Sequence, residues 1–453
     1  MAQLKKYTFI IAALVMVYNL KAQDAKSNSF SLQQAIEYAL KNSPNYLNSE
    51  LDLKNADFKR KEITGMGLPQ VTGSLDLKDY LNLPTSLLPG QIFGAAPGTF
   101  LPVKFGTKYN ATAGLSFSEN ISSDYFFGLT AQREFMNLSK INVLRSKTDL
   151  VAQVTKAYYT VMISRERIKT LEANITKLKK TYSDTKVSNQ QGLVELIDVE
   201  RLEVQYNNLL TEYDKTAKLI ELSEVTLKFQ MGYKMQDPIA ISDSLNMDNN
   251  PFQELNSSKP DVSQRPDYKI LKAQQALNEL DIKRQKFAFL PSLSAYGSLQ
   301  YNAQRNAFTI FQASGSDVTK SWYNIALIGA SLNFNFFTGW QRMNRLEQAK
   351  ITSFKNLNTI KNLEMAAELE ARSAATIYNN AYLTLERQKK NMELAQHVYD
   401  VSRKKYESGV GSNTEVVNAQ ASLTEAQTNY YNSVFDMVVA KIDYQKATGT
   451  LVK

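Results

Sequence analysis

The sequence predicts a mainly α-helical chain that also carries four β-strands of a membrane β-barrel. The helices and strands are arranged as two copies of one structural unit. Long helical stretches, four short segments with strand periodicity and motifs that recur at matching spacings support this fold class. In "LIGASLNFNFFTGW" (327–340), Ile328, Ala330 and Leu332 share one parity, whereas Gly329 and Ser331 share the other. Because successive side chains of a strand point to opposite faces, this alternation indicates a strand with one apolar and one polar face.

The first 23 residues have the layout of a secretory signal peptide. Two lysines precede an apolar run from about Tyr7 to Leu20, and a short polar exit follows. The run is too short to cross a bilayer as a folded helix. We therefore expect residues 1–23 to be a signal peptide and the protein to leave the cytoplasm.

Composition excludes several classes of function. The formal net charge is +9, but acidic and basic residues are interspersed, so nucleic-acid binding has little support. The chain has no cysteine and a single histidine, His397. A disulfide framework, a cysteine-based metal site, a zinc enzyme and a histidine-based triad are therefore not expected. We predict no enzymatic activity, no cofactor and no metal.

Matching spacings indicate an internal duplication. We expect a first repeat over 24–232, an irregular connector over 233–263 and a second repeat over 264–453. The spacing is 25 residues from Pro44 to Pro69 and from Pro266 to Pro291, and 40 residues from Gly192 to Gly232 and from Gly409 to Gly449.

Each repeat is expected to hold two strands and one coiled-coil hairpin. The strands are predicted at about 69–81 and 109–121, then at about 291–302 and 323–337. The hairpins turn near residues 192 and 409, and three-four alternation marks their seams. The seam residues are Val199, Leu202, Tyr206, Leu209, Tyr213, Ala217 and Ile220 in the first hairpin, and Val416, Ala419, Leu423, Ala426, Tyr430, Val434 and Met437 in the second.

Four amphipathic strands fit either an outer-membrane barrel or a soluble sheet with one wet face. The signal peptide and the long helices favour the membrane. Four strands cannot close a barrel, and open sheet edges in lipid would leave backbone groups without partners. We therefore expect the barrel to be shared with other copies of the chain, and the small polar positions to line a water-filled lumen. The proline-rich segment at about 82–108 is expected to be an extracellular loop, as is the segment at 302–322.

The segment "YESGVGSNTEVVNAQASLTEAQTNYYNSVFDMVVAKIDYQKATGTL" (406–451) and the duplicated strand pairs resemble the TolC-type outer-membrane efflux proteins. The resemblance covers the chain from about Ser31 to Leu451. It implies a homotrimer in which twelve strands form a barrel in outer-membrane lipid and twelve helices form a periplasmic tunnel, with the connector as a belt. Such a protein is a passive exit duct of a tripartite efflux or secretion system.

The resemblance also implies partners, namely a periplasmic adaptor and an inner-membrane pump of the RND or ABC type. The alternative is that the chain is itself a periplasmic adaptor, a class that also has a signal peptide and long helical hairpins. An adaptor has one hairpin with glycine-rich β domains, whereas this chain shows four alternating strands in a duplicated frame. The duct is therefore the favoured interpretation.

The residues implied for the site lie at the two hairpin turns. The turns "GLVEL" (192–196) and "GVGSN" (409–413) match the tips that meet the adaptor, through Gly192, Leu193, Val194, Gly409, Val410 and Gly411. Asp198 and Tyr406 match a pair that latches the periplasmic aperture, but Gly411 stands where some members have an arginine that completes the latch. Glu415 matches one of two acidic positions that ring the aperture, and Asn418 replaces the other.

Overall fold

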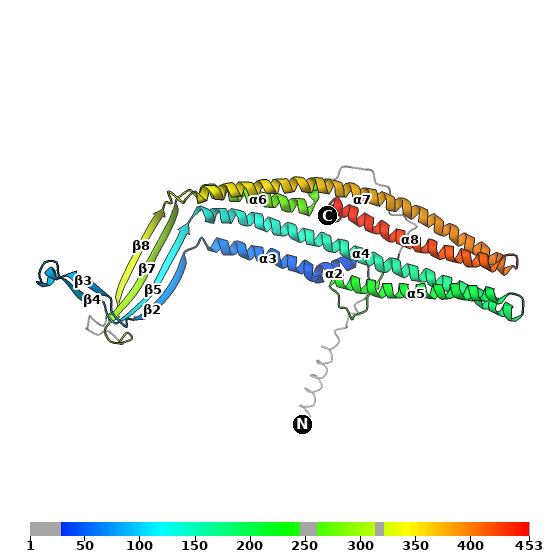
Figure 1. Cartoon of the computed structure of the whole chain (residues 1–453), viewed down its shortest axis with the longest axis horizontal. Coiled ribbons are helices and arrows are strands. Elements are labelled where there is room, and N and C mark those ends of the chain that lie inside the picture. The colour runs from blue at the N-terminus through cyan, green and yellow to red at the C-terminus, as the bar shows by residue number, and fades with distance from the viewer. Residues whose placement is uncertain (1–28, 245–260, 313–320, 453) are drawn as a thin grey trace, which may run out of the picture. The chain divides into compact units, whose positions relative to one another are not determined.

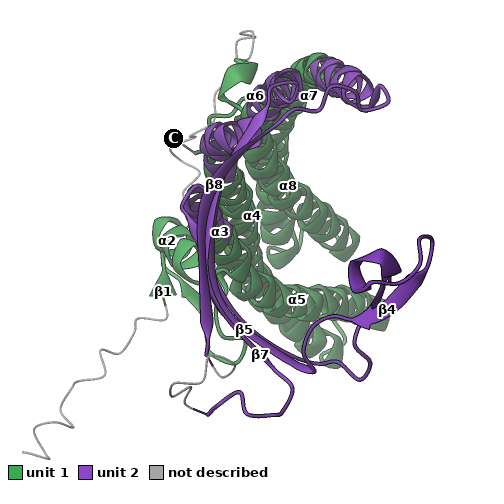
Figure 2. Cartoon of the chain, turned by 90° about the vertical axis from the view of Figure 1, so that its left-hand side faces the viewer, with its two compact units in different colours: residues 1–51, 140–270, 360–453 green, residues 52–139, 271–359 purple. Residues whose placement is uncertain are grey.

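The computed structural model of the 453-residue chain describes residues 29–244, 261–312 and 321–452. The expected signal peptide at 1–23 lies outside the described residues, as do parts of the expected connector and of the loop at 302–322. The chain divides into two units, which Figure 2 colours separately: one is formed by residues 1–51, 140–270 and 360–453, and the other by residues 52–139 and 271–359.

Helices make up most of the described chain (Figure 1). Four of them run through both units, and three lie wholly in the first unit. The helices that run through both are α3 (Pro44–Gly65), α4 (Ser123–Gln190), α6 (Pro266–Phe287) and α7 (Gln341–Glu407). Those of the first unit are α2 (Leu32–Asn42), α5 (Leu196–Met231) and α8 (Asn413–Ala447), with a short parallel pair of strands, β1 (Ser29–Phe30) and β6 (Ala240–Ile241), and a 3₁₀ turn, η2 (Val262–Gln264).

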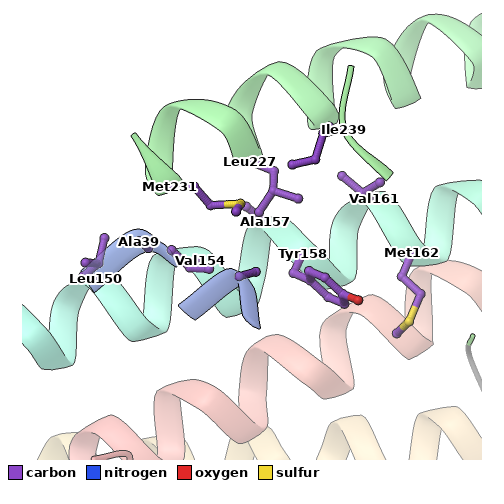
Figure 3. Close-up of a cluster of buried hydrophobic side chains, with 11 residues drawn as sticks. Ala39, Leu150, Val154, Ala157, Tyr158, Val161, Met162, Leu227, Met231 and Ile239 are labelled. Atoms are coloured by element: carbon purple, nitrogen blue, oxygen red, sulfur yellow. The ribbon is translucent and has the colours of Figure 1, made fainter. Parts of the chain in front are cut away.

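Helix α2 begins at a capping box and supplies a small-residue face to the main core of the first unit. The Ser31 hydroxyl accepts from the Gln34 backbone N–H, and the Gln34 side chain accepts from the Ser31 N–H, so two donors at the helix start are satisfied. The fully buried Ala39 faces helices α4 and α5. Figure 3 shows the cluster that they enclose, which includes Tyr158 and Leu227.

Burial confirms most of the predicted seam of α8 and three of the seven predicted seam residues of α5, namely Val199, Leu202 and Leu209. In the α4–α5 hairpin, Leu171 and Leu178 pack with Leu202 and Leu209, each pair one heptad apart. In α8, six of the seven predicted seam residues are buried, namely Val416, Ala419, Leu423, Tyr430, Val434 and Met437. Near its turn each hairpin has its own apolar cluster, whereas Tyr430, Val434 and Met437 of α8 share a cluster with Ala152 and Ile163 of α4.

The second unit contains an antiparallel four-stranded sheet in the order β2–β5–β7–β8. Its strands are β2 (Gln70–Asp79), β5 (Tyr109–Ile121), β7 (Ser292–Arg305) and β8 (Tyr323–Asn333). Strand β8 ends four residues before the expected end near 337. Further on, Gly339 and Trp340 both adopt positive φ, 59° and 65°, directly before helix α7 begins.

The segment at 82–108 is not the strand-free loop that its prolines suggested. It folds into an antiparallel hairpin of β3 (Thr85–Pro89) and β4 (Phe100–Lys104), joined through a 3₁₀ turn, η1 (Gly90–Phe93). Proline lacks the N–H that a central strand needs, but a two-stranded ladder leaves half of its donors unpaired in any case. Pro89 and Pro102 are therefore tolerated within it.

In the part of the chain that the structure describes, no helix combines the length and the apolar character needed to cross a bilayer.

The main core of the first unit gives a stability prediction. Leu227 is fully buried in the cluster of Figure 3, so Leu227→Ala should destabilise the protein by about 2–5 kcal/mol through lost contacts and a cavity. The measurement is thermal unfolding followed by helical circular dichroism. Leu227→Met is the matched control, because it preserves volume and should cost less than about 1.5 kcal/mol. Equal unfolding temperatures for wild type and Leu227→Ala would show that the cluster contributes little.

Candidate functional site

The strand register brings the alternating patterns of all four strands into phase. Val71 pairs with Phe117, Phe117 with Gly297, and Gly297 with Ile328, so these residues form one row across the sheet. Directly paired residues of an antiparallel sheet lie on the same face. The sheet therefore has one continuous apolar face, which carries Val71, Leu75, Leu77, Ala113, Leu115, Phe117, Leu293, Leu299, Ile328, Ala330 and Leu332.

Most of the apolar face is uncovered by the rest of the described chain, although Ala111 and Ala303 at one end of it pack against Ile310 and Trp322. Val71 is 69% exposed, Leu75 is 77% exposed and Ile328 is 83% exposed. Monomeric soluble proteins rarely leave an apolar patch of this extent in water. The face is suited to contact with lipid.

The opposite face is mainly polar and is tied together across strands. The Thr112 hydroxyl donates to the Asn302 amide oxygen at 2.7 Å, and the Ser294 hydroxyl donates to the Asn120 amide oxygen at 2.7 Å. Strand β8 departs from the pattern, because its register places Ile325 and Leu327 on this side. Most of the remaining positions are polar, namely Gln70, Thr72, Ser74, Asp76, Lys78, Asn110, Ser116, Ser118, Ser298, Gln300, Ser331 and Asn333.

Aromatic side chains flank the sheet at both ends, a feature that the strand periodicity did not predict. At the end where β5 begins, the rings of Tyr109 and Phe308 lie 5.5 Å apart, and Trp322 packs nearby. Beyond the other end of β8, Phe334 stacks on Phe336 with 5.8 Å between ring centroids. Paired aromatic girdles mark the two interfaces of membrane β-proteins. The run "NFNFFTGW" was the sequence signal for one of them.

The turn between α4 and α5 is built by a left-handed glycine. Gly192 has φ 74°, the Leu193 N–H donates to the Ser188 carbonyl at 2.9 Å, and the Asn189 amide donates to the Val194 carbonyl at 2.7 Å. Added atoms at Gly192 would meet open space, so its backbone angle, not crowding, favours glycine. The Leu193 side chain is left 72% exposed.

The turn between α7 and α8 is tighter. Gly409 has φ 74°, and the Lys405 carbonyl accepts from both Val410 and Gly411, at 3.0 and 3.1 Å. A Cβ on Gly411 would lie 2.8 Å from the Lys405 Cβ and 3.0 Å from the Tyr406 nitrogen, so this position admits only glycine without rearrangement. Val410 is 81% exposed. Figure 1 shows both turns at the same end of the helical unit.

Side chains connect the two hairpins just behind their turns. The Asn413 amide donates to the Asp198 carbonyl oxygen at 2.6 Å and to the Asp198 carboxylate at 3.1 Å. The Arg201 guanidinium donates to the Thr414 hydroxyl at 2.9 Å and lies 3.8 Å from the Asp198 carboxylate within its own helix. Asp198 lies in the first turn of α5, where the helix dipole also favours a negative charge. Helix α8 therefore contributes an amide and a hydroxyl to this junction, and both charges come from α5.

The hydrogen bond that the family resemblance implied between Tyr406 and Asp198 is not formed in this structure. The Tyr406 hydroxyl instead lies 3.0 Å from the Thr185 hydroxyl, on the other helix of the first hairpin, while Asp198 is occupied by Asn413. Asn413, which sequence reasoning passed over as one letter of the turn motif, is only 3% exposed. Its position at the start of α8, directly after the Ser412 cap, was the only sequence signal for it.

Glu415 and Asn418 lie one helical turn apart on the exposed side of α8. The Glu415 backbone N–H donates to the Ser412 hydroxyl at 3.2 Å, which caps the helix. On the buried side, Val416 and Leu423 pack against Tyr399 of α7, and burial raises the pKa of the Tyr399 phenol to about 12. The acidic side chain is thus held on a rigid helix whose other side is anchored in the seam.

Comparison with known proteins agrees with this geometry. The family model for outer membrane efflux proteins matches residues 262–450. The probable efflux pump outer membrane protein TtgC of Pseudomonas putida is 23% identical over 353 residues, covering 76% of this chain and 69% of that protein. The outer membrane protein TolC of Vibrio cholerae is 19% identical over 346 residues, covering 75% and 77%. The crystal structure of the outer membrane protein VceC from Vibrio cholerae superposes with a TM-score of 0.69 at 15% identity, covering 92% of this chain and 96% of that chain.

The amphipathic sheet and the long helical hairpins define the class: an outer-membrane channel protein with a periplasmic helical part. Residues 262–450 match the outer membrane efflux protein family, and the chain is similar to outer-membrane efflux proteins of the TolC type. Its function is that of the exit duct of an efflux system, and the adaptor alternative is set aside. The fold and the relatives are those of channel proteins, not of known enzymes.

The two turn glycines of the second hairpin should respond differently to substitution. Gly409→Asn should be tolerated, because asparagine adopts positive φ more readily than other residues and the site is open. Gly411→Ala should loosen the turn, because its Cβ collides with Lys405 and the Tyr406 backbone. Hydrogen exchange of the peptide that spans the turn should be faster in Gly411→Ala than in Gly409→Asn. The reverse order would show that backbone angle alone controls this turn.

Proposed function

We propose that the chain forms a homotrimeric outer-membrane channel, in which three four-stranded sheets close one twelve-stranded barrel around a water-filled lumen. The observation that carries this proposal is the in-phase sheet, apolar on one face and mainly polar on the other, with β2 and β8 as its edges. Lipid suits the apolar face, and water suits the polar face. The trimer is the count that the family resemblance implies.

The two sheet edges make association necessary. Strand β2 has ten residues and β8 has eleven, and within the described residues each pairs with a neighbour on one side only. Unpaired backbone groups in lipid cost several kcal/mol each. Pairing β2 of one copy with β8 of the next satisfies both edges and leaves no open edge in the ring.

The duplication is supported by matched element lengths. Helices α3 and α6 both have 22 residues, α4 and α7 have 68 and 67, and α5 and α8 have 36 and 35. We assign the first repeat to residues 24–232 and the second to 264–453, with 233–263 as the connector. In a trimer, the two hairpins of each chain would then occupy equivalent positions in the wall of a helical tunnel.

The α4–α5 and α7–α8 turns are the proposed contact sites for a periplasmic adaptor. The adaptor would receive substrate from an inner-membrane pump. TtgC is described as an efflux pump component, and this chain is proposed to act in such an assembly. Leu193 and Val410 project apolar side chains from tight glycine turns, next to the small Gly192, Gly409 and Gly411 and the half-buried Val194. Such a surface offers apolar anchors with little bulk around them.

The periplasmic aperture is the proposed gate. The Asn413–Asp198 and Arg201–Thr414 contacts would hold the two hairpins of each chain together, in place of the Tyr406–Asp198 latch. Three copies of Glu415, with Asn418 one turn away, would ring the aperture with negative charge. Charged rings in narrow pores attract counter-ions by focusing the field.

The assembly state is tested by mass. We expect the purified protein in detergent to have the mass of three chains by light scattering, because trimerisation pairs every sheet edge. The same sample should show a β signal in circular dichroism, and heating in dodecyl sulfate should convert the band to one chain. A monodisperse single chain that retains its β signal would contradict the closed twelve-stranded barrel.

The aperture is tested by two variants with different readouts. Glu415→Gln should reduce cation preference in planar bilayers, because it removes the charge of the proposed ring. Asn413→Ala should raise conductance while leaving preference nearly unchanged, because it deletes a hydrogen bond to a carboxylate, worth about 1.5–3 kcal/mol, that joins the hairpins.

The control for charge is Glu425→Gln, the same substitution further along α8. It should change neither quantity. Unchanged selectivity in Glu415→Gln would remove Glu415 from the aperture, whatever the state of the barrel. Unchanged conductance in Asn413→Ala would mean that the hairpin junction does not restrict the pore.

A further inference from the structure

The β3–β4 hairpin is a well-defined element that follows the end of strand β2. The Gly90 N–H donates to the Thr99 carbonyl at 2.7 Å, and the Thr99 hydroxyl donates to the Ala96 carbonyl at 2.7 Å. A Cβ on Gly90 would lie 2.2 Å from the Thr99 hydroxyl, so the turn closes tightly on itself. At its base the Phe105 N–H donates to the Pro84 carbonyl at 3.1 Å. The hairpin is therefore a defined structure that carries its side chains in fixed positions.

Its side chains are unusually apolar for an exposed segment. Ile92 is 69% exposed, Phe93 is 58% exposed and Phe100 is 61% exposed. Between Asp79 and Glu119 the sequence has no acidic residue. Exposed apolar patches of this kind mark surfaces that are covered by a partner.

The position of the hairpin indicates what covers it. Figure 2 shows it on the concave side of the curved four-stranded sheet, within the same unit. The concave side of a sheet that closes into a barrel is the inside, whereas lipid contacts the convex side. Lipid of the same membrane therefore cannot cover Phe93. In a symmetric trimer, the β3–β4 hairpins of the other two copies lie on the same inner side of the barrel. They are the apolar surfaces available to cover this hairpin.

We propose that the β3–β4 hairpins of three copies meet over the outer mouth and form an apolar constriction there, with Ile92 and Phe93 at the contact. This rests on the proposed trimer. The hairpin follows edge strand β2 directly, so it leaves the sheet at the boundary where the next copy pairs. An apolar constriction excludes water and ions more strongly than apolar solutes. The channel then has an outer restriction in series with the periplasmic aperture.

The absence of native cysteine allows a direct test by cross-linking. Phe93→Cys, treated in intact cells with a three-armed maleimide, should give a covalently linked trimer. Asn306→Cys is the control, since Asn306 is exposed at the same end of the sheet but outside the hairpin. The Asn306→Cys variant should react with a monofunctional maleimide, but the three-armed reagent should not link it into trimers.

A conductance measurement tests the constriction itself. Ile92→Ser combined with Phe93→Ser should raise single-channel conductance about twofold if the outer restriction and the inner aperture contribute equal resistance in series. Phe311→Ser is the matched control, because Phe311 is an aromatic residue 84% exposed in the segment after β7. It should leave conductance unchanged.

The outcomes separate this proposal from the trimer on which it rests. If the Phe93→Cys protein has the mass of three chains but is not cross-linked, the hairpins do not meet and the constriction is wrong. Brominated lipids that quench a fluorophore attached to the thiol of the Phe93→Cys variant would likewise overturn it, because the hairpin would then lie in the bilayer. A single-chain mass for the same variant and for wild type would instead overturn the trimer, and the constriction with it.

Discussion

Backbone hydrogen bonding at the sheet edges is the constraint on which the rest of this structure depends. A four-stranded sheet with an uncovered apolar face is stable only where that face meets lipid, and in lipid its edge N–H and C=O groups have no water to bond. The association of copies through β2 and β8 that we propose would give these edge groups partners while the apolar face stays in lipid. The in-phase register of the strands gives the sheet one continuous apolar face, which the proposed ring would need as a band around its outside.

The helical hairpins solve a different problem, because their surroundings are aqueous. Their stability comes from heptad seams such as Leu202 and Leu209 against Leu171 and Leu178, not from an apolar outer surface. A seam of this kind holds two helices in register over a long distance. It fixes the position of the turn residues along the helix axis, so the contacts of Asp198 with Asn413 depend on packing at Leu202 and Leu209, about one and three helical turns away.

Periodicity was sufficient to predict what depends on local pattern. The alternation in 327–333 and the three-four spacing in α8 report directly which side chains face a common surface. The β3–β4 hairpin was missed because its prolines are evidence against strands. Proline removes a backbone N–H donor, but in a two-stranded ladder half of these donors have no partner in any case. The Thr185–Tyr406 and Asn413–Asp198 pairs join residues more than 200 positions apart, and no local pattern specifies which of several polar neighbours meet. The aromatic flanks lay partly outside the strands and therefore outside the alternation.

The geometry of the second turn explains why the junction behind the turns has a different chemistry from the latch that the family resemblance implied. Gly411 sits against Lys405 and the Tyr406 backbone with no space for a Cβ, so the turn excludes an arginine at that position. Without that charge, the Asp198 carboxylate takes the buried Asn413 amide as its donor in the other hairpin. The amide–carboxylate bond in this partly buried junction is less sensitive to salt than an exposed ion pair between the hairpins, because only one of the two bonded groups is charged. A change in the position of the hairpins, rather than a change in ionic conditions, is thus the event that would open this junction.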